Sequence, residues 1–312
     1  MSKRKSTFAV VTAAALIGTA TGCGSGSADT GGEESIKLGL ALSTLNNPFF
    51  VEMKKGAEAE AKAQGAKLNV QDAQDDASQQ ANQIQNFTSQ GVKSIIINPV
   101  DSDAAAPSVK AATNADIPVV AVDRTVNKAK VATTVASDNV SGGEKAAKDL
   151  AKQLNQEGSI LMLRGQPGTS ASRERGKGFM TAIKKYPGIK VVGKQAANFD
   201  RAKGLDVTTN LLQAHPDVTG IFAENDEMAL GAIKALGGRA GKQIKVVGFD
   251  GTPDGFKAIK KGTLNTSIAQ QPQELGKMAV RNAIRKVEGS DPDISIKVPV
   301  VTVNSKNIDS YS

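Results

Sequence analysis

Short β-branched runs alternate with amphipathic segments along most of this 312-residue chain. Helical patterns separate most of these runs, which from residue 35 onward are IKLGLAL, KLNVQ, SIIIN, PVVAVD, TTVAS, SILML, KVVGKQ, GIFAEN, KVVGFD and NTSIAQ. Strands that alternate with helices favour right-handed βαβ units and mostly parallel sheets with both faces covered. The pattern therefore predicts an α/β fold.

The length of the patterned region indicates how these units are grouped. About ten strands in roughly 275 residues are too many for one small sheet, because single cores stop growing near this size. We expect two doubly wound, Rossmann-like domains with parallel sheets. A TIM barrel also alternates strands with helices and is the structural alternative.

The first residues have the layout of a secretory signal. Lys3, Arg4 and Lys5 precede the 11-residue run FAVVTAAALIG, and small residues follow it. The run is too short for a membrane span, which needs about 20 apolar residues. We predict a signal peptide over residues 1–22.

Cys23, the only cysteine of the chain, follows this segment directly. A single cysteine allows no internal disulfide and no cysteine-based zinc site. Small residues before Cys resemble the lipobox of bacterial lipoproteins, although Ala20 stands where Leu is commonest. The resemblance implies lipidation of Cys23, with residues 23–34 as a flexible Gly/Ser-rich tether. Cleavage after Ala20 without lipidation is the alternative.

The charge pattern does not favour a nucleic-acid partner. Removal of the signal lowers the 39 Lys and Arg residues to 36 against 31 Asp and Glu residues, which leaves a net charge of +5. The basic residues are interleaved with acids, as in EMKKGAEAEAKAQG, and this is typical of solvated helix faces. A nucleic-acid surface would need a concentrated basic stripe.

Polar and aromatic side chains follow the ends of most predicted strands. In open parallel sheets, ligands bind beyond the carboxyl ends of the strands. Asn and Asp at such junctions often cap the next helix, but amides and carboxylates are also the groups that bind many hydroxyls. The residues that follow these ends are Ser43, Asn47, Phe49, Phe50, Asn98, Asp123, Arg124, Phe199, Asn225, Asp250 and Gln270.

Over residues 36–305 the sequence resembles the periplasmic sugar-binding proteins of the ribose-binding type, the solute receptors of ABC importers. The motifs that carry this resemblance occur in order: STLNNPFF, INPVDSDA, DR at 123–124, ASDNVSGG, GTSASRERGKGF, FDRAKGLDV, AHPDV, NDEMALGA, VVGFDGTPDG and IAQQP. The resemblance implies the type I periplasmic binding protein fold, with a hinge of three crossings near residues 137, 270 and 300. The N-terminal lobe would then comprise residues 35–137 plus 271–299, and the C-terminal lobe residues 138–270 plus 300–312.

The resemblance also implies which residues hold a sugar between the lobes. The polar contacts of the first lobe would be Asn47, Asp123 and Arg124. Those of the second lobe and hinge would be Arg175, Asn225, Asp250 and Gln270. Phe49, Phe50 and Phe199 would form aromatic walls, with Ser43 and Asn98 in supporting positions.

The chemistry of this set agrees with a neutral ligand. Two aspartates and two arginines carry no net charge, whereas a carboxylate or phosphate ligand would favour surplus positive charge. Sugar hydroxyls donate to Asp and accept from Arg, and so they satisfy groups that are costly to bury alone. D-ribose is the expected ligand; another pentose, a hexose or a furanose-like signal is the alternative.

The resemblance implies an extracytoplasmic, monomeric receptor that delivers the monosaccharide to an ABC-transporter permease. The permease would recognise the form in which the lobes have closed on the sugar. The lipid anchor would be its only membrane contact, and no cofactor, metal or nucleic acid is expected.

Two other classes of protein, a sugar-active enzyme and a DNA-binding repressor, are the alternatives to a receptor. In a glycosidase, Asp123 and Asp250 would be the acid and the nucleophile. A general acid needs a raised pKa, however, and we expect Arg124 and Arg175 to lower the pKa of nearby carboxylates. His215, the only histidine, lies in a helix-to-strand turn where a role as a base is not expected. The effector domain of a LacI-type repressor shares the architecture, but a secretory signal stands where its helix-turn-helix would be.

Overall fold

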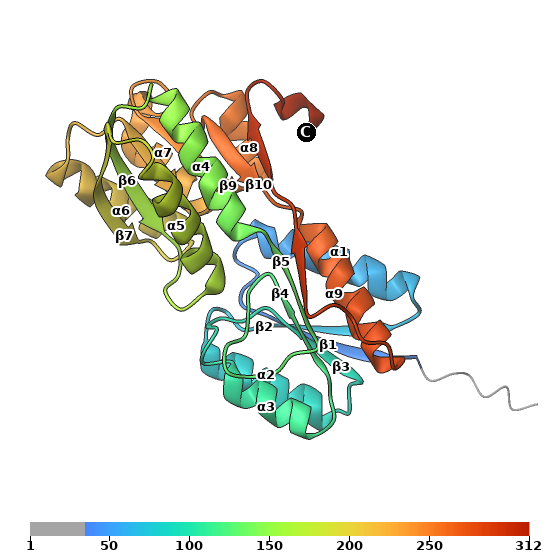
Figure 1. Ribbon diagram of the computed structural model, residues 1–312. Coiled ribbons are helices and arrows are strands. Elements are labelled where there is room, and N and C mark those ends of the chain that lie inside the picture. Colours follow the sequence, from blue (N-terminus) through green and yellow to red (C-terminus); the bar gives the residue numbers. More distant parts are fainter. Residues whose placement is uncertain (1–34, 312) are drawn as a thin grey trace, which may run out of the picture. The chain divides into compact units, whose positions relative to one another are not determined.

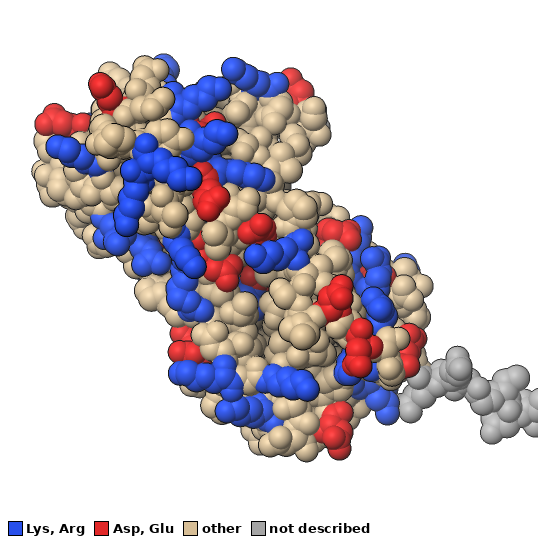
Figure 2. Space-filling view, in the orientation of Figure 1, with Lys and Arg blue, Asp and Glu red and all other residues tan. Residues whose placement is uncertain are grey.

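The computed structural model describes residues 35–311, which form two sheets covered by helices (Figure 1). The predicted signal peptide, Cys23 and the predicted tether lie outside the described residues. Within the described part, no helix is long and apolar enough to cross a membrane. On the face drawn in Figure 2, Lys and Arg side chains are spread over the surface with Asp and Glu side chains among them.

The first sheet has six strands, and every neighbouring pair is parallel. In spatial order they are β11 (Ser295–Val298), β5 (Thr133–Ser137), β4 (Val119–Val122), β3 (Ser94–Ile97), β1 (Lys37–Leu42) and β2 (Lys67–Asp72). The helices of this lobe are α1 (Pro48–Ala63), α2 (Ala77–Ser89), α3 (Ala106–Asn114) and α9 (Pro272–Val287). Because β1 lies between β2 and β3, the chain adds β2 on one side of β1 and then β3, β4 and β5 on the other side, so the strand order reverses at β1.

The second sheet repeats this order with the next part of the chain. Its strands are β12 (Val301–Asn304), β10 (Thr266–Ala269), β9 (Lys245–Asp250), β8 (Gly220–Ala223), β6 (Gly158–Arg164) and β7 (Ile189–Ala196). Only β12 runs antiparallel to its neighbour. The helices are α4 (Asn139–Gln153), α5 (Ser170–Ile183), α6 (Arg201–Ala214), α7 (Asp226–Leu236) and α8 (Pro253–Lys260), with short 3₁₀ turns η1 (Gly237–Arg239) and η2 (Ile308–Ser310).

The chain passes between the two sheets three times, after β5, after β10 and between β11 and β12. The predicted fold class of two doubly wound parallel-sheet domains is therefore confirmed. The TIM-barrel alternative is wrong, because the strands form two separate open sheets. The sequence pattern did not predict β11 and β12, since each is a four-residue edge strand with a mostly half-buried or exposed surface.

Strand periodicity explains how each sheet is covered on both faces. Leu38, Leu40 and Leu42 of β1 pack in one core with α1 and α9, whereas Ala41 packs in another with α2 and α3. Successive side chains of a strand point to opposite faces, so an all-apolar strand is buried on both. In the second lobe the same division places α4 and α5 on one face and α6, α7 and α8 on the other.

Glycines allow the helices on each sheet to approach closely. A Cβ on Gly276 of α9 would lie far inside van der Waals contact with the carbonyl oxygen of Met53 in α1, and one on Gly56 of α1 would meet the carbonyl of Gln273. The other two helix pairs have the same arrangement, at Gly143 and Gly178 between α4 and α5, and at Gly204 and Gly231 between α6 and α7. The close packing of these helices therefore requires glycine at these positions, because even the methyl group of alanine would overlap backbone atoms.

The first prediction concerns this close packing. Gly276→Ala should lower the free energy of unfolding by about 1–3 kcal/mol, because the methyl group overpacks the α1–α9 contact. This loss should exceed the roughly 1 kcal/mol that Ala gains over Gly in a helix. Urea denaturation measures it. Gly238→Ala, at a position with open space around the added Cβ, is the control and should stay within about 0.5 kcal/mol of wild type. Equal stability of all three proteins would contradict the packing.

Candidate functional site

A small cavity lies where the carboxyl ends of the strands of the two sheets meet. The space between its lining residues, including the part open to solvent, is about 230 Å³. The cavity is lined by Asn47, Phe49, Phe50, Asp123, Arg124, Ala171, Arg175, Phe199, Asn225 and Asp250. Nine of the ten residues predicted to contact a ligand line this one cavity. Gln270 does not line it, and Ala171 was not predicted.

The cavity holds four buried charged side chains. Asp123, Arg124, Arg175 and Asp250 each expose 4% of their surface or less. In the first lobe, Arg124 Nε lies 3.6 Å from Asp123 Oδ2. In the second lobe, Arg175 Nη1 lies 3.1 Å from Asp250 Oδ1. Each lobe thus contributes one acid and one base, and the formal charges sum to zero when all four are ionised.

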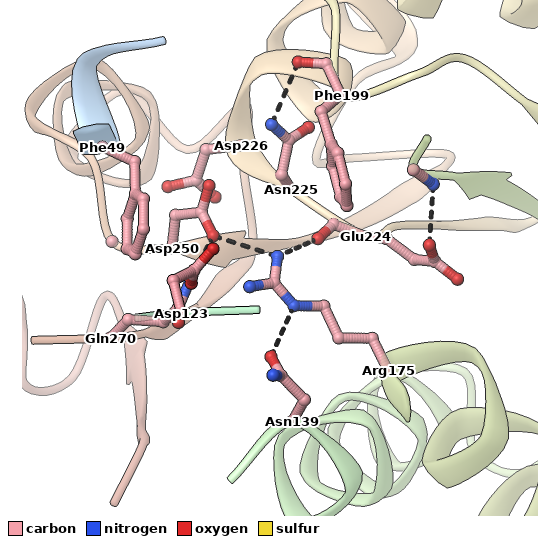
Figure 3. Close-up of polar contacts among 12 residues, drawn as sticks. Phe49, Asp123, Asn139, Arg175, Phe199, Glu224, Asn225, Asp226, Asp250 and Gln270 are labelled. Carbon is pink, nitrogen blue, oxygen red and sulfur yellow. Dashed lines mark hydrogen bonds and ion pairs between the residues drawn. The ribbon is translucent and has the colours of Figure 1, made fainter. Parts of the chain in front are cut away.

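The guanidinium of Arg175 is held from several sides (Figure 3). Its Nε donates to Asn139 Oδ1 at 2.9 Å, and its Nη1 donates to the carbonyl oxygen of Glu224 at 2.7 Å. The group also lies over the ring of Phe249, 3.9 Å from the centroid, in a cation–π contact. Sequence reasoning missed these three partners, because no local motif marks a contact made across the fold. They fix the direction in which the remaining Nη2 donor points.

Behind the cavity, three of the predicted residues support the acids. Asn98 Nδ2 donates to Asp123 Oδ2 at 3.2 Å, and Ser43 Oγ donates to Asn98 Oδ1 at 2.7 Å. In the second lobe, Gln270 Nε2 donates to Asp250 Oδ1 at 2.7 Å. The structure therefore places Ser43 and Asn98 one layer outside the cavity. It places Gln270 there too.

Several buried polar atoms of this region have no hydrogen-bond partner among the described residues. They include Asp123 Oδ1, Arg124 Nε and Gln270 Oε1. More than nine in ten buried polar groups in proteins are paired, and leaving one unpaired costs about 1–3 kcal/mol. Since Asp123 and Arg124 line the cavity, a ligand with hydroxyl groups could both donate to the carboxylate and accept from the guanidinium.

Aromatic rings form the apolar walls. Phe49 and Phe50 pack edge to face with centroids 5.2 Å apart. The ring of Phe199 contacts the guanidinium groups of both Arg124 and Arg175, each 5.7 Å from its centroid. Arg124 also lies 5.2 Å from the Phe50 centroid. The cavity therefore combines apolar ring faces with polar groups that converge from both lobes.

The two asparagines both cap helices and line the cavity. Asn47 Oδ1 accepts from the backbone N–H of Phe49 at 3.0 Å and begins α1. Asn225 Oδ1 accepts from Met228 N at 2.9 Å and begins α7, while its Nδ2 donates to the carbonyl of Phe199 at 3.1 Å. Capping and cavity lining were weighed as alternatives for these positions, and the structure combines them.

Three cavity residues have left-handed backbone conformations that are uncommon for residues other than glycine. The φ angles are 64° at Asp123, 60° at Phe199 and 113° at Asp250. Such conformations cost about 1–3 kcal/mol each and cluster at functional sites. They turn these side chains at the ends of β4, β7 and β9 toward the cavity.

Burial dominates the electrostatics of the two acids. It raises the pKa of Asp250 to about 8, with Arg175 opposing the shift, and it also raises the pKa of Asp123 against the effect of Arg124. The arginines do lower these pKa values, as expected, but burial raises them by more, so the net shift of each pKa is upward. Desolvation of an almost fully buried carboxyl group outweighs the neighbouring positive charge.

The remaining candidates lie apart from the cavity. His215 ends α6, where its backbone N–H donates to the carbonyl of Leu211. Within residues 35–311, no group of three or more His, Cys, Asp and Glu side chains is placed to hold a metal ion.

Comparison with known proteins identifies the family. Residues 38–291 match the family described as periplasmic binding protein domain. The chain belongs to this family. It is accordingly an extracytoplasmic binding protein and not an enzyme, so the glycosidase alternative is wrong despite the raised pKa values.

Curated relatives match over most of their length. The chain is 46% identical to the ribose import binding protein RbsB of Bacillus subtilis, covering 87% of this chain and 88% of that protein. It is also 46% identical to the ribose import binding protein RbsB of Escherichia coli, covering 84% of this chain and 88% of the relative.

Solved structures share the fold. An ABC transporter solute binding protein from Bacillus halodurans with bound myo-inositol superposes with a TM-score of 0.84 at 32% identity, covering 90% of this chain and 99% of that one. A periplasmic solute binding protein from Actinobacillus succinogenes with bound D-allose gives a TM-score of 0.83 at 33% identity. The match covers 88% of this chain and 99% of that one.

The raised pKa of Asp250 predicts a pH dependence of stability. The folded protein keeps this proton up to about pH 8, whereas the unfolded chain loses it above about pH 4. The stabilisation that this bound proton gives the folded protein is complete below about pH 4. It decreases as the pH rises and is lost once the pH passes about 8. Asp250→Asn cannot ionise. Relative to this variant, the free energy of unfolding of the sugar-free wild type should therefore fall by about 1.4 kcal/mol per pH unit between about pH 5 and 7.

Urea denaturation at several pH values measures this difference. Asp254→Asn is the control, because the Asp254 side chain is 45% exposed and Lys257 and Arg201 lower the pKa of its carboxyl group. The Asp254 carboxyl group is ionised above pH 5 in both the folded and the unfolded protein. The free energy of unfolding of Asp254→Asn should therefore change with pH in parallel with that of wild type. If the free energies of unfolding of Asp250→Asn and wild type changed in parallel with pH, the raised pKa of the Asp250 carboxyl group would be contradicted.

Proposed function

We propose that the protein is a sugar receptor that captures D-ribose between its two lobes and delivers it to the permease of an ABC importer. The observation that carries this proposal is the cavity itself, in which acids, guanidinium groups and phenyl rings from both lobes converge. The 46% identity to ribose import binding proteins over most of both chains supports ribose as the sugar.

A pentose suits the chemistry of the cavity. Its hydroxyls can donate to Asp123 Oδ1 and accept from Arg124 Nε, two buried cavity atoms that have no hydrogen-bond partner among the described residues. The Nη2 group of Arg175 and the Nδ2 group of Asn47 supply further donors. The C–H faces of the sugar ring can lie against Phe50 and Phe199. Because these charged side chains are buried, the hydrogen bonds contribute more than they would in water.

Capture couples binding to lobe closure. Asp123 and Arg124 follow β4 of the first sheet, whereas Arg175 and Asp250 belong to elements of the second. A sugar can contact both sets only when the lobes are together, and so it shifts the population toward the closed form. We propose that the N-terminal lobe comprises residues 35–137 plus 271–299, and the C-terminal lobe residues 138–270 plus 300–312. The closed form of a single chain would be the form that the permease binds.

Another sugar of similar size is the second candidate. Solved structures of similar fold carry myo-inositol and D-allose, so the fold accepts ligands of several shapes. Isothermal titration with D-ribose, D-allose, myo-inositol and L-arabinose ranks these ligands. D-ribose should bind most tightly, and a hexose or inositol that binds more tightly would replace it.

Arg175→Gln should weaken D-ribose binding by about 30-fold or more. The change removes a buried charged donor worth about 2 kcal/mol. Titration calorimetry measures the dissociation constant. Lys177→Gln is the matched control: Lys177 lies on the same helix but is exposed.

The control variant should bind ribose within about threefold of wild type. Thermal unfolding of both sugar-free variants checks that each is folded. Equal ribose affinity for Arg175→Gln and Lys177→Gln would remove Arg175 from the site and contradict the proposed binding mode.

We further propose that Cys23 carries a lipid that holds the receptor at the outer face of the cytoplasmic membrane. Ala20 and the small residues around it support processing at this point, with residues 23–34 as the tether. Cys23→Ala should move most of the protein from the membrane fraction to the soluble fraction of expressing cells. An immunoblot of the two fractions measures the shift, and an unchanged distribution would leave secretion after cleavage at Ala20 as the better account.

A further inference from the structure

A turn between β6 and α5 contacts the opposite lobe without lining the cavity. This turn, residues 165–169, belongs to the second lobe and leads directly into Ser170 at the start of α5. Its partners are the segment after β3, residues 99–103, and the segment after β4, residues 124–127. All three segments lie outside the chain crossings between the lobes, so the contact is a separate connection between them.

Two hydrogen bonds join the lobes here. The backbone N–H of Ser102 donates to the carbonyl oxygen of Gly168 at 3.1 Å. The backbone N–H of Thr125 donates to Ser170 Oγ at 2.9 Å. Within the first lobe, Asn127 N donates to the carbonyl of Ser102 at 2.7 Å. This bond joins the two segments that donate to the second lobe.

The backbone of the turn also fits closely against the first lobe. A Cβ on Gly168 would overlap Oδ2 of Asp101, and the φ angle of Gly168 is +89°. Asp101 has little freedom to move aside, because its Oδ1 accepts from the backbone N–H groups of Asp103 and Ala104, both at 2.8 Å. Only glycine fits at position 168 while the lobes are in contact.

The contact is buried in this arrangement. Ser102 is 1% exposed, Thr169 0% and Ser170 2%. Separation of the lobes would break both interlobe hydrogen bonds and return their groups to water. The stabilisation is therefore available only while the lobes are together.

We propose that this contact is a latch that raises sugar affinity without touching the sugar. The inference rests on the proposed function, since it assumes that a sugar binds the closed lobes. The sugar and the latch stabilise the same arrangement, so each makes the other more favourable. The latch acts after closure, and it slows the release of the sugar rather than speeding its capture.

Ser170→Ala tests the interlobe hydrogen bond. It removes the acceptor of the half-buried Thr125 N–H, which would then be unpaired in the closed form. The dissociation constant for ribose should rise about tenfold, through faster dissociation with an unchanged association rate. The unfolding temperature of the sugar-free protein should match that of wild type. Stopped-flow binding, calorimetry and thermal unfolding supply the three readouts.

Gly168→Ala and Gly262→Ala form a matched pair. Both place a methyl group at positive φ, +89° and +71°, but nothing lies within 4 Å of the Cβ at position 262. Both variants carry similar backbone strain, so a difference in ribose affinity isolates the clash with Asp101. Gly168→Ala should bind ribose at least tenfold more weakly than Gly262→Ala.

The outcomes separate the latch from the receptor function. A wild-type protein that binds no sugar would overturn the proposed function, and this is measured before any variant. If wild type binds ribose, equal affinity and equal release rates for Ser170→Ala and wild type would overturn the latch. A lower sugar-free unfolding temperature for Ser170→Ala would also overturn it, because the contact would then exist without the sugar.

Discussion

The burial of two acids and two arginines in one cavity is the constraint on which the rest of the structure depends. Buried ions are costly unless each is paired and fully hydrogen-bonded. Here each lobe pairs its own acid and base, at 3.6 Å in the first and 3.1 Å in the second. Burial still dominates, as the raised pKa of Asp250 shows. Asp123 and Arg124 each retain a buried atom without a hydrogen-bond partner among the described residues. A ligand rich in hydroxyls therefore completes the hydrogen bonding of groups that the fold has already placed.

The repeated strand order brings these groups together. In both sheets the first strand of the lobe lies between the second and third, and the carboxyl ends of parallel strands at such a reversal are where ligands bind. The helices that follow begin at Asn47 and Asn225, whose side chains cap them and line the cavity. Left-handed backbone at Asp123, Phe199 and Asp250 then directs these side chains inward. The latch at Gly168 adds a connection that depends on the same arrangement.

Local patterns in the sequence predict what local physics determines. Alternation of apolar runs and amphipathic segments was enough for the two doubly wound sheets, and the motifs at the strand ends led to most of the cavity lining. The edge strands β11 and β12 were missed because four half-buried residues carry little apolar signal. Ala171 gave no signal because a small apolar residue is common everywhere. Asn139 and Phe249 hold Arg175 through contacts between distant segments. The sign of the pKa shifts depends on burial, which only the folded structure provides.

The central claim is that an uncharged sugar joins the charged groups of both lobes and thereby holds the lobes together. Small-angle X-ray scattering of the protein with and without saturating D-ribose tests this claim most directly. The account predicts a smaller radius of gyration with ribose, and no change with an equal concentration of a sugar that calorimetry shows not to bind. An identical radius of gyration at a ribose concentration that saturates the calorimetric titration would contradict it.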